Sequence, residues 1–178
     1  MYIGVYRLGY DSVHSMMKGG KTMNFINKTE RGQSLVELAI SLVILLYLLS
    51  GVVEFGIAFF QFIQLRDAAQ EGALYGSVNP NTEGPIATRV RNASQQPIDL
   101  TVTSGPRAVT VTVTALDGST NSEKALSSAC VGDGIRVQVE FDHQIFMPFI
   151  PALIGSETIH LNGNVTDTIL RSTAAGCP

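Results

Sequence analysis

The sequence lacks most of the residues from which enzyme, metal and nucleic-acid sites are built. Its 178 residues include no tryptophan, two cysteines and three histidines, and its net charge at pH 7 is only −3. Cys130 and Cys177 belong to no CxxC pair and to no cysteine–histidine set, which argues against a zinc site. The sequence has no glycine-rich phosphate loop and no nucleophile elbow, and its distal part has no cluster of lysine and arginine beside aromatic residues. These absences favour a structural protein with no cofactor, no metal, no enzymatic activity and no nucleic-acid partner.

Charged residues are also missing from one long stretch. Residues 38–53 contain none, and apolar residues resume after Glu54 and continue to Ile63. A transmembrane helix needs about 20 mostly apolar residues, so the sequence predicts one membrane span. The preceding residues 1–32 carry five basic and two acidic side chains. The positive-inside rule therefore predicts a single-pass protein of the cytoplasmic membrane, with its N-terminus in the cytoplasm and its C-terminal part outside.

Residues 34–76 contain no proline and predict one continuous helix, which ends at Gly76 and the following Asn-Pro-Asn turn. Such a helix would be about 64 Å long, roughly twice the thickness of the hydrocarbon core, so its distal half would leave the membrane. There, small and apolar side chains recur at three- and four-residue spacing: Ala58, Phe62, Leu65, Ala69 and Ala73. We expect this stripe to pack against the rest of the protein, with polar residues such as Gln61 and Gln64 on other faces.

Beyond residue 97 the spacing of apolar residues changes to two, which is typical of strands with one buried face. The alternation is found in four segments, residues 98–103, 109–114, 135–142 and 159–170. Residues 117–134 are expected to form a long loop. We therefore predict an α+β fold in which a long N-terminal transmembrane helix packs on a small antiparallel sheet of about four strands.

The sequence divides into four expected parts. Residues 1–32 form a basic cytoplasmic leader, 33–76 the long helix, 77–96 a loop and a short helix, and 97–178 an extracytoplasmic β domain. Met23 would give a shorter leader than Met1, and both starts remain open.

Three motifs lie along the predicted helix. They read Gly-Gln-Ser-Leu-Val-Glu-Leu-Ala at residues 32–39, Val-Val-Glu-Phe-Gly at residues 52–56 and Ala-Ala-Gln-Glu-Gly-Ala-Leu-Tyr at residues 68–75. In this order and spacing they resemble the TadE-like family of pilus-assembly pseudopilins. Gln70 and Leu74 replace arginines that are usual in the family, and Val43 stands where many relatives carry a proline, so no proline kink is expected.

The resemblance implies processing at the start of the helix. A prepilin peptidase would cut after Gly32, remove the leader and leave Gln33 as the first residue, with Glu37 at the fifth position of the mature chain. The new amine of Gln33 would then be a positive partner for Glu37, whose carboxylate is costly near apolar surroundings when it is unpaired. The alternative is an uncleaved anchor in which Glu37 stays in the headgroup zone.

A second carboxylate, Glu54, would lie about 28 Å along the helix from Leu35, near the outer membrane boundary. It is interpreted either as an acid at the water interface or as a partner for another helix in an assembly. Glu37 and Glu54 are about 100° apart around the helix, which argues against a paired-carboxylate active site. His143 and His160 are expected to be surface residues. Residues 146–154 are expected to cover the core, with membrane insertion or partner binding as the second interpretation.

Cys130 and Cys177 lie on the side of the span where disulfides persist. One precedes the third predicted strand and the other follows the fourth, so antiparallel pairing of these strands would bring the two cysteines together. We predict a disulfide, and two free thiols are the alternative.

Taken with the resemblance, these features predict a membrane-anchored pseudopilin or minor pilin that acts structurally in Tad-type pilus assembly or secretion. Its expected partners are the membrane, the prepilin peptidase and other pilin or pseudopilin subunits, which would pack on the N-terminal helix. The alternative function is an uncleaved single-pass membrane protein whose β-rich ectodomain serves adhesion or sensing.

Overall fold

The computed structural model describes residues 30–148, 150–172, 174 and 177. The chain forms two compact units, residues 1–42 and 43–178, which are described separately. In the first unit the described residues belong to the start of helix α1 (Glu30–Val78), and the side chains from residue 32 to residue 42 are all exposed. Most of the expected leader, including Met1 and Met23, lies outside the described residues.

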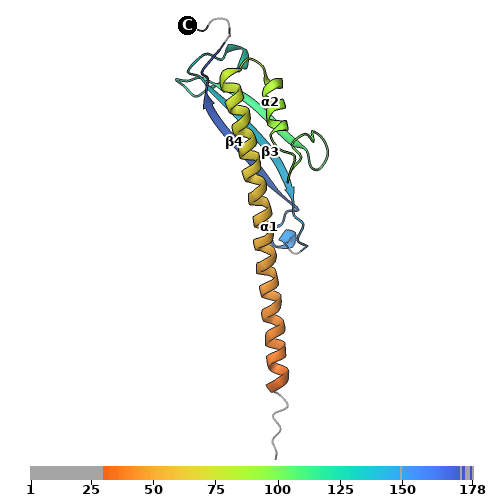
Figure 1. Cartoon of the computed structure of the whole chain (residues 1–178). Helices are drawn as coiled ribbons and strands as arrows, with labels where there is room; N and C mark the ends of the chain where they lie inside the picture. The colour runs from red at the N-terminus through yellow and green to blue at the C-terminus, as the bar shows by residue number, and fades with distance from the viewer. Residues whose placement is uncertain (1–29, 149, 173, 175–176, 178) are drawn as a thin grey trace, which may run out of the picture. The chain divides into compact units, whose positions relative to one another are not determined.

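The second unit contains the rest of α1, helix α2 (Glu83–Asn92) and one sheet (Figure 1). The strands are β1 (Val109–Leu116), β2 (Glu123–Lys124), β3 (Gly134–Gln144) and β4 (Thr158–Thr168), in the order β2-β1-β3-β4. Every neighbouring pair is antiparallel. A 3-10 turn (Leu126–Ser128) precedes β3, and the short helix α3 (Ile150–Ile154) lies between β3 and β4. The predicted α+β fold, with a long apolar helix and a four-stranded antiparallel sheet, is confirmed.

One of the four predicted strands is wrong. Residues 98–103 form turns, and the fourth strand is instead β2, within the stretch 117–134 that was expected to be a loop. Ile98 and Leu100 are buried as the alternation suggested, but side chains satisfy their backbone groups. The Gln64 amide donates to the Ile98 carbonyl (2.7 Å) and accepts from its N–H (2.9 Å), while Arg91 donates to the Leu100 carbonyl (3.0 Å). The alternating apolar residues therefore indicated correctly which side chains are buried, but these residues do not form a strand.

The stripe on α1 packs as expected. Ala58, Leu65, Ala69 and Ala73 are buried, and Phe62 is half-buried. The main core forms between this face, α2 and the inner face of β1, β3 and β4. The expectation for Gln61 and Gln64 is wrong, because both are buried at the edge of the same face. Gln64 lies there because its amide ties the loop at Ile98 to the helix.

Glycines allow α1 to pack closely on α2 and on the sheet. A Cβ on Gly72 would lie 2.3 Å from Val90 Cγ2, and one on Gly76 would lie 2.5 Å from Ile135 Cδ1. On β4, a Cβ on Gly163 would lie 2.7 Å from both the Arg66 nitrogen and the Leu65 carbonyl carbon. These last neighbours are helix backbone atoms, which cannot rotate away as a side chain can. Gly163 therefore sets how closely α1 approaches β4.

We expect Gly163→Val to destabilise the chain by about 1–3 kcal/mol, because overpacking must push the strand and the helix apart. The measurement is the urea midpoint of unfolding of the full chain in detergent micelles, with near-UV circular dichroism as the signal. Gly84→Ala is the matched control: it lies in α2, where a Cβ meets nothing within 4 Å, and alanine favours helices over glycine by up to about 1 kcal/mol. A Gly163→Val midpoint equal to that of the unmodified chain would contradict the close contact.

The chain after β4 is fastened at two places. The Leu170 N–H donates to the Ser77 carbonyl at the end of α1 (2.8 Å), and a disulfide joins Cys130 to Cys177 with a Cα–Cα distance of 5.3 Å. Pairing of β3 with β4 places Gly134 opposite Thr168, so the segments before β3 and after β4 lie side by side. In the chain-entropy model, closing a loop across a sequence separation of 47 stabilises the fold by about 4 kcal/mol.

The disulfide predicts that the two cysteines resist alkylation in the unfolded, unreduced protein and react after reduction. Intact mass spectrometry counts the added groups. Cys177→Ser, which leaves Cys130 without its partner, should take up one alkyl group before reduction and so shows that labelling is complete. Two groups on the unreduced wild-type chain would mean that the thiols are free.

Candidate functional site

The predicted processing residues lie in the first unit. Gly32, Gln33 and Glu37 are all in the first turns of α1 and all exposed. Apart from the adjacent helix backbone, a Cβ on Gly32 would meet no described atom within 4 Å, so packing among the described residues does not explain why this position is a glycine. Within this unit, another molecule can therefore reach both the Gly32–Gln33 bond and the Glu37 carboxylate.

One helix among the described residues is long and apolar enough to cross a membrane. The candidate span lies within Gly32–Val78, and its most apolar window has a mean hydropathy of 2.4 with no residue buried. In the second unit, the exposed large apolar residues of this helix include Val43, Ile44, Leu45, Leu46, Leu48, Leu49, Val52, Val53, Phe55, Ile57, Phe59 and Phe60. A continuous exposed apolar surface of this kind marks a membrane or protein interaction site. The helix therefore indicates membrane anchoring.

Glu54 interrupts the apolar sequence but does not face outward. Its side chain is buried, with a relative exposure of 2 % for the residue. One carboxylate oxygen lies 2.7 Å from His143 Nε2 and 3.3 Å from the Phe146 N–H, and the other accepts from the Met147 N–H (3.1 Å). In this chain the carboxylate thus joins α1 to the end of β3 and the loop that follows. A further partner for Glu54 on another subunit's helix stays a prediction.

The expectation that His143 is a surface residue past the third strand is wrong. His143 lies within β3 and is 1 % exposed. The alternation of Val137, Val139 and Phe141 simply continues to residue 143, so its side chain points to the buried face. Its ring also packs edge-on against Phe146, with centroids 5.9 Å apart. Continuing the period-two pattern by one step would have found this residue.

The loop beside Glu54 is more exposed than expected. Phe146, Leu153 and Ile154 are 63 %, 81 % and 51 % exposed, so the expectation that residues 146–154 cover the core is wrong for these side chains. Next to Glu54, apolar residues of α1, α3 and β4 line a groove of about 380 Å³. The groove opens onto the same apolar side of α1 that carries Phe55 and Phe59.

Two further charged groups have shifted pKa values and structural roles. Hydrogen bonds from Lys124 and then from the Cys130 N–H lower the pKa of Asp133, which fastens β2 to the turn before β3. His160 is exposed on β4, as predicted, and its hydrogen bond to Asp142 raises its pKa. Both groups bind neighbouring elements of the sheet domain to one another.

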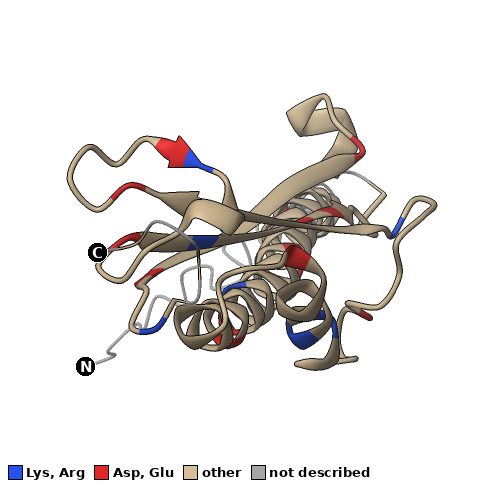
Figure 2. Ribbon diagram, turned by 90° about the horizontal axis from the view of Figure 1, so that it is seen from above, with Lys and Arg blue, Asp and Glu red and all other residues tan. Residues whose placement is uncertain are grey.

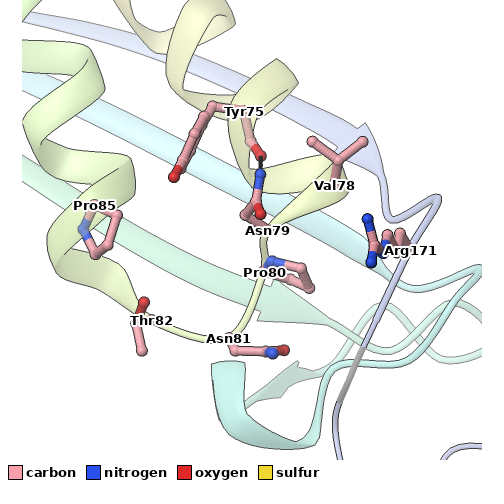
Figure 3. A pocket seen from close by; sticks show the side chains of 8 residues that line it. All are labelled: Tyr75, Val78, Asn79, Pro80, Asn81, Thr82, Pro85 and Arg171. Atoms are coloured by element: carbon pink, nitrogen blue, oxygen red, sulfur yellow. Dashed lines mark hydrogen bonds between the residues drawn. The ribbon is translucent and has the colours of Figure 1, made fainter.

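A polar pocket of about 280 Å³ lies at the distal end of α1 (Figure 3). Figure 3 shows Asn79 and Pro80 in the middle of the lining, with Tyr75 and Thr82 to one side and the Arg171 side chain to the other. The lining has no carboxylate, imidazole or thiol among the described residues. It therefore offers no acid–base pair for catalysis.

Comparison with known proteins gives one finding for this chain. Residues 32–74 match the model of a family described as TadE-like protein. The match confirms the resemblance seen in the sequence and starts at the glycine of the predicted processing site. No curated protein and no solved structure matches the chain.

Proposed function

We propose that this chain, which matches the TadE-like family over residues 32–74, is a membrane-anchored pseudopilin or minor pilin of a Tad-type pilus or secretion machine. The family is associated with Tad pilus assembly and is not known to be enzymatic. The observation that carries the proposal is this match over an apolar helix whose surface is exposed in both units. A prepilin peptidase would cut between Gly32 and Gln33.

The function would be packing. Before assembly, lipid surrounds the apolar surface of α1 and keeps the precursor in the cytoplasmic membrane. During assembly, other pilin helices replace the lipid on the same surface, as transmembrane helices associate by close packing. The β domain, residues 97–178, stays outside the cytoplasm with α2 and caps or regulates the assembly.

Glu37 would guide that packing. After cleavage the amine of Gln33 carries a positive charge at neutral pH, and it can pair with Glu37 of the same or a neighbouring subunit. Pairing removes the cost of an isolated carboxylate near hydrocarbon, about 2.5–3.5 kcal/mol at a helix centre and less near its end. The cost of an unpaired Glu37 would therefore favour the packing position of the helices in which this carboxylate meets the amine of Gln33.

We expect Glu37→Leu to insert into the membrane at least as well as the wild-type chain but to form several-fold fewer pili. Insertion is measured by the amount of chain in the membrane fraction, and assembly by pili sheared from whole cells. Ser41→Leu is the matched control, because it adds an apolar side chain one turn further on without removing a charge. Normal pilus numbers with Glu37→Leu would rule out the pairing role.

A further inference from the structure

The segment between β3 and β4 is unusually apolar for an extracytoplasmic loop. Residues 145–156 contain no charged residue, and α3 within them carries none (Figure 2). Among the described residues outside α1, the large exposed apolar side chains are Val131, Phe146, Leu153, Ile154 and Leu170. Three of these five belong to this one segment. Outside α1, the exposed apolar surface of the second unit is therefore concentrated in this segment.

That place is continuous with the apolar surface of α1. In Figure 1, α3 is the short blue helix beside α1, and Ile150 Cδ1 lies 4.0 Å from the position of a Cβ on Gly51. Counted along the sequence, 20 residues from Leu38, the first of the uncharged stretch, reach Ile57. A span of that length includes Gly51 and Glu54. The segment that contacts this part of the helix would then lie at the depth of the outer leaflet.

At the start of the segment, four backbone N–H groups have partners within the chain. In lipid every polar backbone group needs a partner within the protein. The N–H of Ile145 donates to the Glu157 carbonyl and that of Ile150 to the Met147 carbonyl. Phe146 and Met147 donate to Glu54. Pro148 and Pro151 have no N–H to satisfy.

The Glu54 carboxylate also has its hydrogen-bond partners within the protein. A carboxylate at membrane depth is expensive unless it faces the protein and is paired. Here His143 and two backbone N–H groups take both oxygens, and the side chain is 3 % exposed. The carboxylate thus holds the apolar segment against α1 without presenting charge to the outside.

We infer that residues 145–148 and helix α3 insert into the outer leaflet of the membrane beside α1, as a second lipid contact of the same chain. Lipid acyl chains fill the groove between α3 and α1, and Phe146, Leu153 and Ile154 contact lipid. This contact goes beyond the proposed function, and it rests only on the membrane anchoring of α1. It would fix the height and the tilt of the sheet domain above the bilayer before assembly.

The absence of tryptophan allows a direct test, because one introduced tryptophan reports on one position. Leu153→Trp probes α3 in the full chain, reconstituted in phosphatidylcholine vesicles at low protein density. Val131→Trp, 63 % exposed in the turn before β3, is the aqueous control, and Leu48→Trp, 65 % exposed on α1, is the membrane control. Ile154→Trp gives a second probe of the segment should Leu153→Trp fold poorly, with folding checked by the disulfide and near-UV circular dichroism.

We expect the fluorescence emission of Leu153→Trp to lie at shorter wavelength than that of Val131→Trp. Lipids brominated near the headgroup should quench it, and iodide should quench it several-fold less than it quenches Val131→Trp. Iodide quenching equal to that of Val131→Trp would overturn the insertion. The anchor would remain intact if Leu48→Trp, near the middle of the span, were quenched by lipids brominated near the ends of their acyl chains. Protection that disappears on tenfold dilution of protein in lipid would also overturn it, because a second copy would then fill the groove. If brominated lipids did not quench Leu48→Trp, α1 would not be in the membrane, and both this inference and the proposed function would fail. If the chain were not cut after Gly32, only the proposed function would be affected.

Discussion

Replacing Gly32 by leucine is expected to abolish processing, so that all of the chain in the membrane keeps its leader. The predicted cut follows Gly32, and a small residue at the cut fits a tight peptidase site. Because a Cβ at position 32 meets no described atom within 4 Å outside the adjacent helix backbone, we expect the larger side chain to leave the fold unchanged. An immunoblot of membranes from cells that contain a prepilin peptidase separates the chain that keeps its leader from the form that begins at Gln33.

Gly32→Ala is the matched control for this loss. Alanine is also small, so most of the chain should still be cut, and membrane insertion of both variants should equal that of the wild type. Efficient shortening of Gly32→Leu would place the cut elsewhere and argue for a signal that does not depend on this glycine. Full-length chain in the wild type as well would support the uncleaved anchor.

Glu54→Ala is expected to release the segment after β3 from α1. The substitution removes the acceptor for His143 Nε2 and for the N–H groups of Phe146 and Met147. A buried donor left without an acceptor costs about 1–3 kcal/mol, which corresponds to a loss of about 5- to 150-fold in protection against amide exchange. Hydrogen exchange of the full chain in nanodiscs, read on peptides that contain Phe146 and Met147, measures this loss.

Glu71→Ala on the same helix is the control for removing a carboxylate. Its ion pair with Arg89 (2.9 Å) is partly exposed, and exposed pairs contribute only about 0–1 kcal/mol. His143→Ala alone and combined with Glu54→Ala should show effects that do not add, because the two residues act as a unit. Unchanged protection in Glu54→Ala, or simple addition in the double variant, would mean that the carboxylate does not hold the segment.

Much of the fold follows from the sequence because its signals are local. The uncharged stretch predicts the helix and its membrane role, and the alternation predicts β1, β3 and β4. The error at residues 98–103 has a physical cause, since burial of alternate side chains does not require a strand when Gln64 and Arg91 satisfy the backbone. Which side chain reaches a distant loop is decided by tertiary packing, and no local pattern encodes it.

The candidate site was only partly predictable for the same reason. The motif around Gly32 and Glu37 is contiguous, and the family match begins there. Glu54 and His143 are 89 residues apart, and their contact depends on how β3 passes the helix. The alternation on β3 could have placed His143 on the buried face, but nothing in the sequence identified Glu54 as its partner.

The most direct test of the account is the N-terminal residue of the mature wild-type protein, determined by mass spectrometry of chain extracted from membranes of the native host. We predict Gln33 as the first residue, with its amine free or methylated so that it can carry the positive charge that pairs with Glu37, and with the disulfide between Cys130 and Cys177 retained. A mature chain that still begins at Met1 or Met23 would contradict processing after Gly32 and would leave an uncleaved, membrane-anchored ectodomain in place of a pseudopilin.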